Sequence, residues 1–207
     1  MVSLWSQYMP LERMMATEIA ERMMSAEEFL EWESAQPCKY ELIDNRIYLM
    51  PGGSRAHENI VAMLIHLILI ALMDREGDVY PGGMKVQVDA LATYTYPDVV
   101  VVCNEPRFRG GSQSGPLENP TLLFEVLSPS TEKIDRTWKM EQYLRIPSLR
   151  GYFLVSQEKP LIESYTRTND LWGFGESIGL KASLSLPAMN CEIRLSEIYR
   201  RVHFEEA

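Results

Sequence analysis

Two apolar segments of the chain each contain a single carboxylate, and this pattern restricts the fold more than any other feature. Residues 96–102 read Tyr-Pro-Asp-Val-Val-Val-Val, with Asp98 as the one charge, and residues 122–127 read Leu-Leu-Phe-Glu-Val-Leu, with Glu125. Short apolar runs of this kind are typical of central strands in a sheet. Burial of an unpaired carboxylate is costly, so each acid requires a partner or a place at a strand end in a cleft.

Strands that follow one another in sequence lie side by side in about two-thirds of cases. We therefore expect Asp98 and Glu125 to converge at one hard divalent cation bound through oxygen ligands. The alternative is structural: one or both acids cap local backbone, or pair with Arg136 or Lys139 on the helix that follows.

The composition indicates one ordinary globular domain. The chain has 207 residues, of which 46% are hydrophobic and 24% charged, and these values exclude a disordered chain or a coiled-coil rod. A formal net charge of -9 argues against a protein that coats nucleic acid through its overall charge. Residues 103–150 nevertheless carry a local net charge of +1, so this stretch is the least acidic part of the chain.

Three features favour a cytoplasmic protein without a membrane span. The cysteines at 38, 103 and 191 form no CxxC pair, so neither a zinc knuckle nor a disulfide scaffold is indicated. The longest apolar stretch, residues 60–73, is shorter than the roughly 20 residues that a bilayer crossing requires, and we expect a buried helix there. Acidic residues interrupt the N-terminus where a secretory signal would be apolar.

We expect an N-terminal extension over residues 1–24 and a single domain over residues 25–207. Ser25 and Glu28 form a capping-box pattern at the start of the first helix of the domain. The alternative is that residues 1–24 form an ordinary helix packed on the core. The remaining pattern predicts helices over residues 54–75, 132–145 and 195–202, a hairpin of strands 39–43 and 46–50, and further strands over 79–80, 85–88, 96–102, 122–127, 152–156, 161–166 and 171–178.

Several motifs resemble the Uma-type restriction endonuclease family, a branch of the PD-(D/E)xK nuclease superfamily. The resemblance rests on the two carboxylate segments, on Phe-Glu-Val-Leu-Ser-Pro-Ser-Thr over residues 124–131, on Asp-Arg-Thr-Trp-Lys over 135–139, on the Tyr143 that follows, and on Pro-Ser-Leu-Arg-Gly-Tyr-Phe-Leu-Val over 147–155. It implies an α/β (mixed α+β) fold, in which helices flank a central mixed β-sheet of the restriction-endonuclease type.

The resemblance also implies the roles of individual residues. Asp98 and Glu125 would bind Mg²⁺, for which Mn²⁺ substitutes, and the carbonyl of Val126 would be a third ligand. The superfamily pattern has a lysine two positions after the glutamate, where this chain has Leu127, and Lys139 on the following helix would supply the amine. Glu41 would add an acid to the metal cluster, although a glutamate on a short amphipathic strand can equally face solvent.

Other residues are candidates for phosphate binding. His57 opens the long helix, where an imidazole and free backbone N–H groups can receive a phosphate, and the alternative is a solvent-facing side chain. Arg107 and Arg109 lie in a Gly-rich loop and can follow a phosphodiester backbone or merely increase solubility, and Arg136 belongs to the same basic stretch. His66 and His203 receive no function.

The predicted function is a magnesium-dependent DNA endonuclease, with DNA as partner and a homodimer as a further option. A second hypothesis is a nuclease-fold module that binds nucleic acid or protein without turnover. A third is a metal-independent hydrolase that uses Asp98 and Glu125 as an acid and base pair, as glycosidases do. Metal binding separates the first from the third, and turnover separates the first from the second.

Overall fold

The computed structural model describes residues 24–43, 45–50, 52–88, 93–111 and 115–204. Residues 1–23 of the predicted extension and Asp44 of the predicted hairpin turn lie outside this set. The helical segments are α1 (Ala26–Ser34), α2 (Arg55–Leu72), η3 (Arg109–Gly111), α3 (Glu132–Ile134), η4 (Asp135–Lys139), α4 (Met140–Tyr143), η5 (Pro187–Met189) and α5 (Leu195–Ile198). The strands are β1 (Tyr40–Ile43), β2 (Arg46–Leu49), β3 (Asp78–Pro81), β4 (Val86–Gln87), β5 (Tyr94–Thr95), β6 (Val99–Val102), β7 (Leu122–Val126), β8 (Gly151–Val155), β9 (Leu161–Thr168), β10 (Leu171–Ile178), β11 (Ser183–Leu186) and β12 (Cys191–Arg194).

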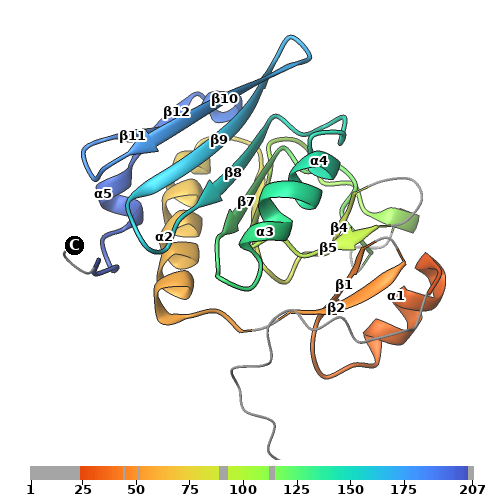
Figure 1. Ribbon diagram of the computed structural model, residues 1–207. Helices are drawn as coiled ribbons and strands as arrows, with labels where there is room; N and C mark the ends of the chain where they lie inside the picture. The colour runs from red at the N-terminus through yellow and green to blue at the C-terminus, as the bar shows by residue number, and fades with distance from the viewer. Residues whose placement is uncertain (1–23, 44, 51, 89–92, 112–114, 205–207) are drawn as a thin grey trace, which may run out of the picture.

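A mixed six-stranded sheet with the order β10-β9-β8-β7-β6-β3 forms the centre of the molecule. Strands β7 and β8 are parallel, and the other neighbours in this sheet are antiparallel. Helix α2 lies on one face, and α3 and α4 lie on the other (Figure 1). A smaller sheet with the order β2-β1-β5-β4 lies beside the central one, and β11 pairs with β12. The predicted mixed sheet flanked by helices is therefore confirmed.

Strand β7 contains Glu125, and strand β6 directly follows Asp98. The two strands are neighbours, as expected, and each is buried on both faces. On β6, Val99 and Val101 pack on the α2 side, and Val100 and Val102 pack on the opposite side. The same alternation on β7 places Phe124 on the α2 side. Successive side chains point to opposite faces of a strand, so Glu125 points toward the layer of α3, η4 and α4.

The predicted strand over residues 96–102 is confirmed only over Val99–Val102, and residues 96–98 lie outside it. Strand β5 ends at Thr95 and pairs with β1 and β4, whereas β6 begins at Val99 and pairs with β3 and β7. The chain passes from the small sheet to the central sheet between these two strands. Asp98 therefore lies at the junction of the two sheets and at the start of β6, where it faces a cleft rather than the core.

The predicted helix over residues 132–145 is interrupted by a π-helical turn, η4. Such a turn inserts a residue into the helix and is frequently found at functional sites. Asp135 and Lys139 in this turn are both buried, and the Tyr152 hydroxyl donates to the Asp135 carbonyl at 3.0 Å. The π-turn thus directs a lysine toward the sheet at the place where β7 ends.

Helix α1 begins with the predicted capping box: Ser25 Oγ accepts from the Glu28 N–H, and a Glu28 carboxylate oxygen accepts from the Ser25 N–H.

Strands β11 and β12 were not predicted from the sequence. The predicted helix over residues 195–202 is shorter, because α5 ends at Ile198.

Helix α2 has one buried face, which was expected, and one exposed apolar face, which was not. Ile60, Leu64, Ile68 and Leu72 pack against the central sheet, whereas Leu69, Ile70 and Met73 are exposed. By length and composition alone, this helix could also cross a membrane: its 18 residues have a mean hydropathy of 1.5, and 22% of them are buried. Its regular buried face against β6 and β7 is typical of a core helix of a globular domain.

Candidate active site

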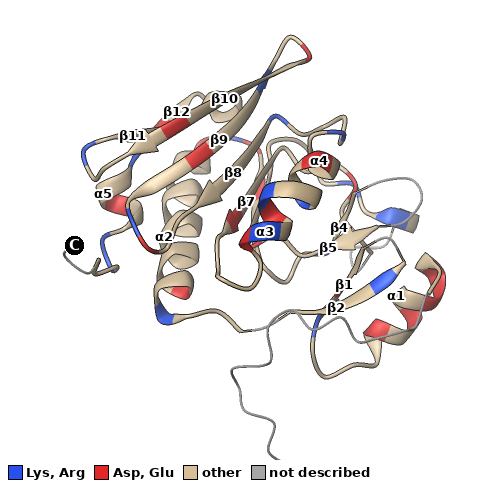
Figure 2. Ribbon diagram, in the orientation of Figure 1, with Lys and Arg blue, Asp and Glu red and all other residues tan. Residues whose placement is uncertain are grey.

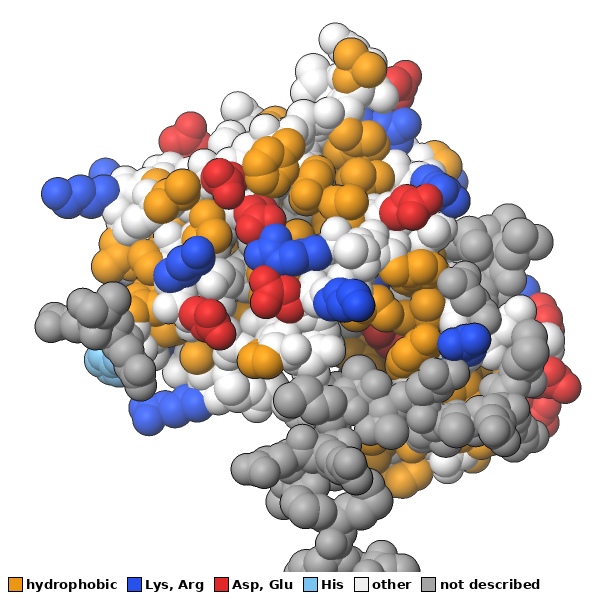
Figure 3. All heavy atoms as spheres, viewed as in Figure 1, with side chains coloured by type: hydrophobic (Ala, Val, Ile, Leu, Met, Phe, Trp, Pro, Cys, Tyr) orange, Lys and Arg blue, Asp and Glu red, His pale blue; other side chains and the backbone are white. Residues whose placement is uncertain are grey.

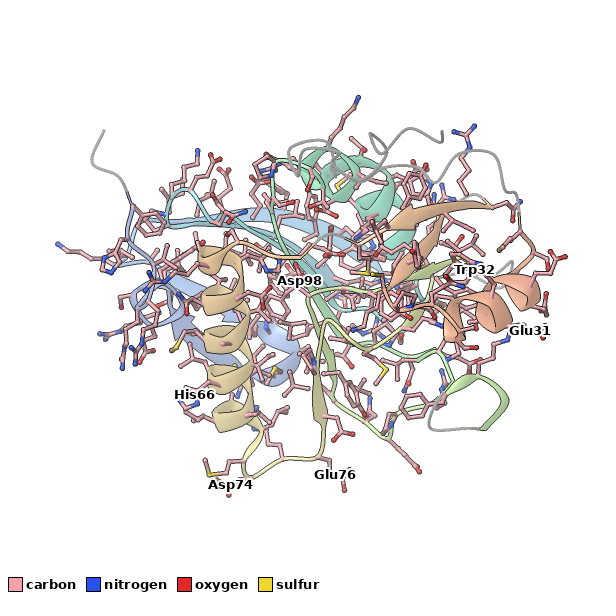
Figure 4. The ribbon with its side chains drawn as sticks, turned by 90° about the horizontal axis from the view of Figure 1, so that it is seen from below. Glu31, Trp32, His66, Asp74, Glu76 and Asp98 are labelled. Atoms are coloured by element: carbon pink, nitrogen blue, oxygen red, sulfur yellow. The ribbon has the colours of Figure 1, made fainter. Side chains whose placement is uncertain are left out.

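A cleft of about 680 Å³ is lined by residues of the small sheet, of the N-terminal part of α2, and of the segments at the start of β6 and the end of β7. Five residues that are far apart in the sequence line it together: Glu41, His57, Asp98, Glu125 and Lys139. Figure 4 shows Asp98 beside α2, whereas His66 lies farther along the same helix, where it is exposed. The structure thus assembles the predicted acids, the histidine and the lysine at one site.

Lys139 is the centre of the buried part of this site. Its Nζ lies 3.1 Å from Glu125 Oε1, 3.1 Å from Glu41 Oε1 and 3.3 Å from Asp135 Oδ1, and its side chain is 4% exposed. One ammonium group therefore faces three buried carboxylates. Where these elements meet, acidic and basic positions gather beside β7 (Figure 2).

Asp98 is held from two sides through one carboxylate oxygen. Its Oδ2 accepts a 2.7 Å hydrogen bond from the Val126 N–H and lies 3.2 Å from His57 Nε2. The Val126 contact ties the start of β6 to the end of β7. His57 Nδ1 lies 3.3 Å from Glu58 Oε1, within ion-pair distance but without the geometry of a hydrogen bond.

Local backbone and packing explain the position of His57. Ser54 Oγ caps α2 by accepting from the His57 N–H at 3.1 Å. A Cβ atom at Gly53 would lie 2.5 Å from His57 Nδ1 and 2.2 Å from Glu58 Oε1, so any side chain at position 53 would displace the imidazole. The glycine and the cap therefore direct His57 into the cleft.

Glu125 and Asp98 each use one oxygen for contacts within the protein. Within the described residues, the hydrogen bonds to Glu125 come from Lys139 and the Tyr143 hydroxyl, and both end on Oε1. The two contacts of Asp98 both end on Oδ2. Glu125 Oε2 and Asp98 Oδ1 are not among the buried polar atoms without partners, so both are accessible from the cleft that the two residues line.

Burial and charge shift the pKa values at this site in defined directions. Burial raises the pKa of Glu125 well above its ordinary value against the opposing effect of Lys139, and burial also raises the pKa of Asp135. Burial alone would lower the pKa of Lys139, but the surrounding acids raise it well above its ordinary value, so the ammonium form persists. Burial would likewise lower the pKa of His57, and the hydrogen bond and charge of Asp98 outweigh it and raise that pKa.

The donor set fits a divalent cation of the magnesium type. Three buried acids share one ammonium, so the cluster has an excess of negative charge when all three are ionised, and Glu125 and Asp98 also line the cleft. Magnesium is usually held by one or two carboxylates and several waters. In the part of the chain that the structure describes, no three side chains of His, Cys, Asp or Glu form a cluster that could hold a metal by themselves. The carbonyl of Val126 and water would have to complete the coordination.

The three predicted arginines lie outside the cleft. Arg136 is ion-paired with Glu132 and Glu163, and Arg109 contacts Glu27 and the Tyr94 hydroxyl. The residues that line the cleft do not include Arg107. Their predicted contacts with phosphate stay predictions for DNA that extends beyond the cleft.

Sequence reasoning gave no role in the site to two kinds of residue, although Tyr143 belongs to the motifs that carry the family resemblance. Lys39 lines the cleft with its Nζ 3.1 Å from the Gly82 carbonyl, although it is an ordinary strand lysine in the sequence. Tyr143 contacts Glu125 from α4, and Thr95 contacts Tyr143 from β5. The spacing of Tyr143 four positions after Lys139 was a usable signal, because both then lie on one side of a helix.

Comparisons with known proteins found a family model and relatives that match most of the chain. A family model described as "Uma2: Putative restriction endonuclease" matches residues 26–196. An uncharacterized protein of Synechocystis sp. (strain ATCC 27184 / PCC 6803 / Kazusa) is 36% identical over 183 residues, which make up 87% of this chain and 94% of the relative. A second uncharacterized protein of the same organism is 31% identical over 169 residues, which make up 81% and 95% of the two chains.

One solved structure has the same fold. It is the crystal structure of a protein from Anabaena variabilis ATCC 29413, described as a putative nuclease belonging to DUF820. The superposition has a TM-score of 0.72 at 16% sequence identity, and it covers 86% of this chain and 98% of that protein. At this identity, the likeness concerns the fold alone.

Proposed function

Since this chain belongs to the Uma2 family, whose description is "Putative restriction endonuclease", we propose that it is a magnesium-dependent endonuclease that hydrolyses phosphodiester bonds in DNA. The observation that carries the proposal is the pair of carboxylates at the ends of two adjacent strands. Asp98 and Glu125 each present one oxygen to the cleft, and the other oxygen of each is held by protein donors.

Asp98, Glu125 and the carbonyl of Val126 would hold the metal. When bound, a magnesium ion lowers the pKa of a coordinated water and neutralises charge on the phosphate. Mn²⁺ would substitute, because it accepts the same oxygen ligands.

The protein's own groups have separate tasks in this proposal. Lys139 places a positive charge beside Glu125 and thereby stabilises negative charge that develops on the reacting phosphate. His57 holds Asp98 Oδ2 and lies in the first turn of α2, where free backbone N–H groups favour a phosphate oxygen. Lys39 supplies a second cation at the cleft, where its Nζ donates to the Gly82 carbonyl.

A binding module without turnover is the second candidate function. Lys139 is engaged by three carboxylates, and the face of the molecule in Figure 3 shows acidic and basic side chains mixed, without a continuous basic surface among the residues described. DNA remains the proposed partner in both cases. A homodimer stays a prediction, which light scattering of the purified chain would test.

The proposal is tested by incubating supercoiled plasmid and short single- and double-stranded oligonucleotides with the full chain. We expect cleavage with Mg²⁺ or Mn²⁺ and none with a chelator. Oligonucleotides of varied sequence and structure guard against a missed specificity. Binding of these substrates without cleavage under any metal condition would favour the binding module.

The pKa shifts predict how metal and pH together affect stability. Glu125, Asp135 and His57 all have raised pKa values in the folded state, so the folded state binds more protons than the unfolded state. Stability of the metal-free protein should therefore fall as pH rises from about 4.3, the ordinary value for Glu, through neutrality. A bound divalent cation favours the ionised acids, so the increase in melting temperature with Mn²⁺ should grow over the same range.

The measurement is a series of thermal melts between pH 5 and 8 with saturating Mn²⁺ or with chelator. Ca²⁺ and a monovalent salt of equal ionic strength serve as controls for charge screening. Identical melting curves with Mn²⁺ and with chelator at pH 8 would contradict the metal site.

A further inference from the structure

The two oxygens of the Glu125 carboxylate have different contacts. A simple ion pair with Lys139 would not require this difference. Lys139 Nζ at 3.1 Å and the Tyr143 hydroxyl at 3.0 Å both bind Oε1. Among the described residues, no donor is bonded to Oε2, and that atom is not enclosed in the core. The protein therefore distinguishes the two oxygens of one carboxylate and directs one of them to the cleft.

Tyr143 is fixed firmly enough to make this distinction. Its side chain is fully buried, and its ring packs edge-on against Tyr152, with centroids 5.1 Å apart and an angle of 80° between the rings. Its hydroxyl also lies 2.9 Å from Thr95 Oγ1. Glu125 Oε1 and Thr95 Oγ1 therefore both lie within hydrogen-bonding reach of the one hydroxyl hydrogen of Tyr143.

The contact with Thr95 alone would satisfy a buried tyrosine hydroxyl. A tyrosine that served only the core would need nothing more, since one partner removes most of the cost of burying the group. The second contact reaches the acid that faces the cleft. It links β5, α4 and β7, which carry Thr95, Tyr143 and Glu125 respectively.

We propose that Tyr143 is a positioning residue whose hydroxyl, oriented by Thr95, holds Glu125 Oε1 and so presents Oε2 for metal binding. This inference rests on the proposed function, because that function supplies the metal ion that Glu125 Oε2 would bind. Groups that orient a metal ligand typically change metal affinity or activity by about 10- to 100-fold when they are removed.

Mn²⁺ binding to the full chain without substrate tests the proposal, with titrations followed by electron paramagnetic resonance. Tyr143→Phe keeps the ring and removes the hydroxyl, and we expect its Mn²⁺ affinity to fall by about 10- to 100-fold. Tyr199→Phe is the matched control, because Tyr199 is also buried and its hydroxyl donates to the Leu161 carbonyl at 2.9 Å in another part of the core. Its Mn²⁺ affinity should match that of the wild type.

Thr95→Val provides a second variant that does not touch Glu125. Thr95→Val should also lower the Mn²⁺ affinity, but by less than Tyr143→Phe does. The double variant should have the Mn²⁺ affinity of Tyr143→Phe alone, because both changes act through one hydroxyl. In cleavage assays, kcat should fall for Tyr143→Phe at saturating metal while KM for DNA stays within about twofold, since the substrate contacts remain.

The outcomes separate this inference from the proposed function. If the wild type binds Mn²⁺ and cleaves DNA, but Tyr143→Phe binds Mn²⁺ as tightly as the wild type, the positioning role is overturned and the endonuclease proposal stands. An equal loss of affinity in Tyr143→Phe and Tyr199→Phe would show a general loss of structure and would also overturn it. If the wild type itself binds no Mn²⁺, both proposals fail.

Discussion

Lys139→Ala is expected to reduce DNA cleavage by about a hundredfold or more, the usual loss when one group that stabilises charge in the transition state is removed. The same change should lower the free energy of unfolding of the metal-free protein by about 3–5 kcal/mol, because it leaves buried carboxylates without their cation. Glu41, Glu125 and Asp135 all lie within 3.3 Å of the Lys139 ammonium. Urea unfolding and plasmid cleavage measure the two effects separately.

The controls for this variant use the other charges of the same region. Lys133→Ala removes an exposed lysine from α3 and should change stability by less than about 0.5 kcal/mol without affecting cleavage. Mn²⁺ should raise the melting temperature of Lys139→Ala more than that of the wild type, because a divalent cation replaces part of the lost positive charge. Full cleavage activity in Lys139→Ala would show that the lysine has only a structural role.

Asp98→Asn is expected to lose the stabilisation by Mn²⁺ and to reduce cleavage by at least about a hundredfold, because the amide removes the charge of a metal ligand. Its metal-free stability should stay close to that of the wild type. Asp98 lies at the edge of the cleft with 18% of its side chain exposed, and its charge raises the pKa of Glu125, so its loss relieves repulsion. The pKa of His57 should fall toward its ordinary value, which NMR titration of the imidazole would record.

Asp170→Asn is the matched control, because Asp170 is an exposed acid in the turn between β9 and β10. It should retain the melting shift with Mn²⁺ and the cleavage rate of the wild type. Retention of the Mn²⁺ shift in Asp98→Asn would exclude Asp98 as a ligand. The two predictions differ in kind, since Lys139 is expected to contribute to stability and activity and Asp98 mainly to metal binding and activity.

Local sequence patterns predicted the elements that surround the site. Valines of β6 and the apolar residues of β7 indicated neighbouring central strands, and period-two alternation determines that Glu125 and Phe124 point to opposite faces. The capping box at Ser25 marked the start of α1. These patterns are readable because each depends on residues close together in the chain.

Two local predictions were correct only in part, where tertiary contacts decided the backbone. Within the apolar run 96–102, the chain crosses from one sheet to another. The composition of this run does not distinguish such a crossing from a strand that continues in one sheet. The π-turn η4 interrupts a sequence with ordinary helical propensity. Glu125 and Glu41 stabilise its inward-facing lysine, and the Tyr152 hydroxyl donates to the Asp135 carbonyl; all three partners lie in other elements.

By itself, the sequence determined which segments are buried strands, which acids lie in them, and, through its motifs, the family whose fold it shares. The tertiary structure alone decided that Glu41 and His57 reach the same cleft as Asp98 and Glu125, and which oxygen of each strand-end acid remains for a ligand. The physical reason is that burial and periodicity are local properties of the chain. Convergence depends on pairing between distant strands and on hydrogen bonds such as those of Val126 and Tyr143, whose partners lie 28 and 18 positions away in the sequence.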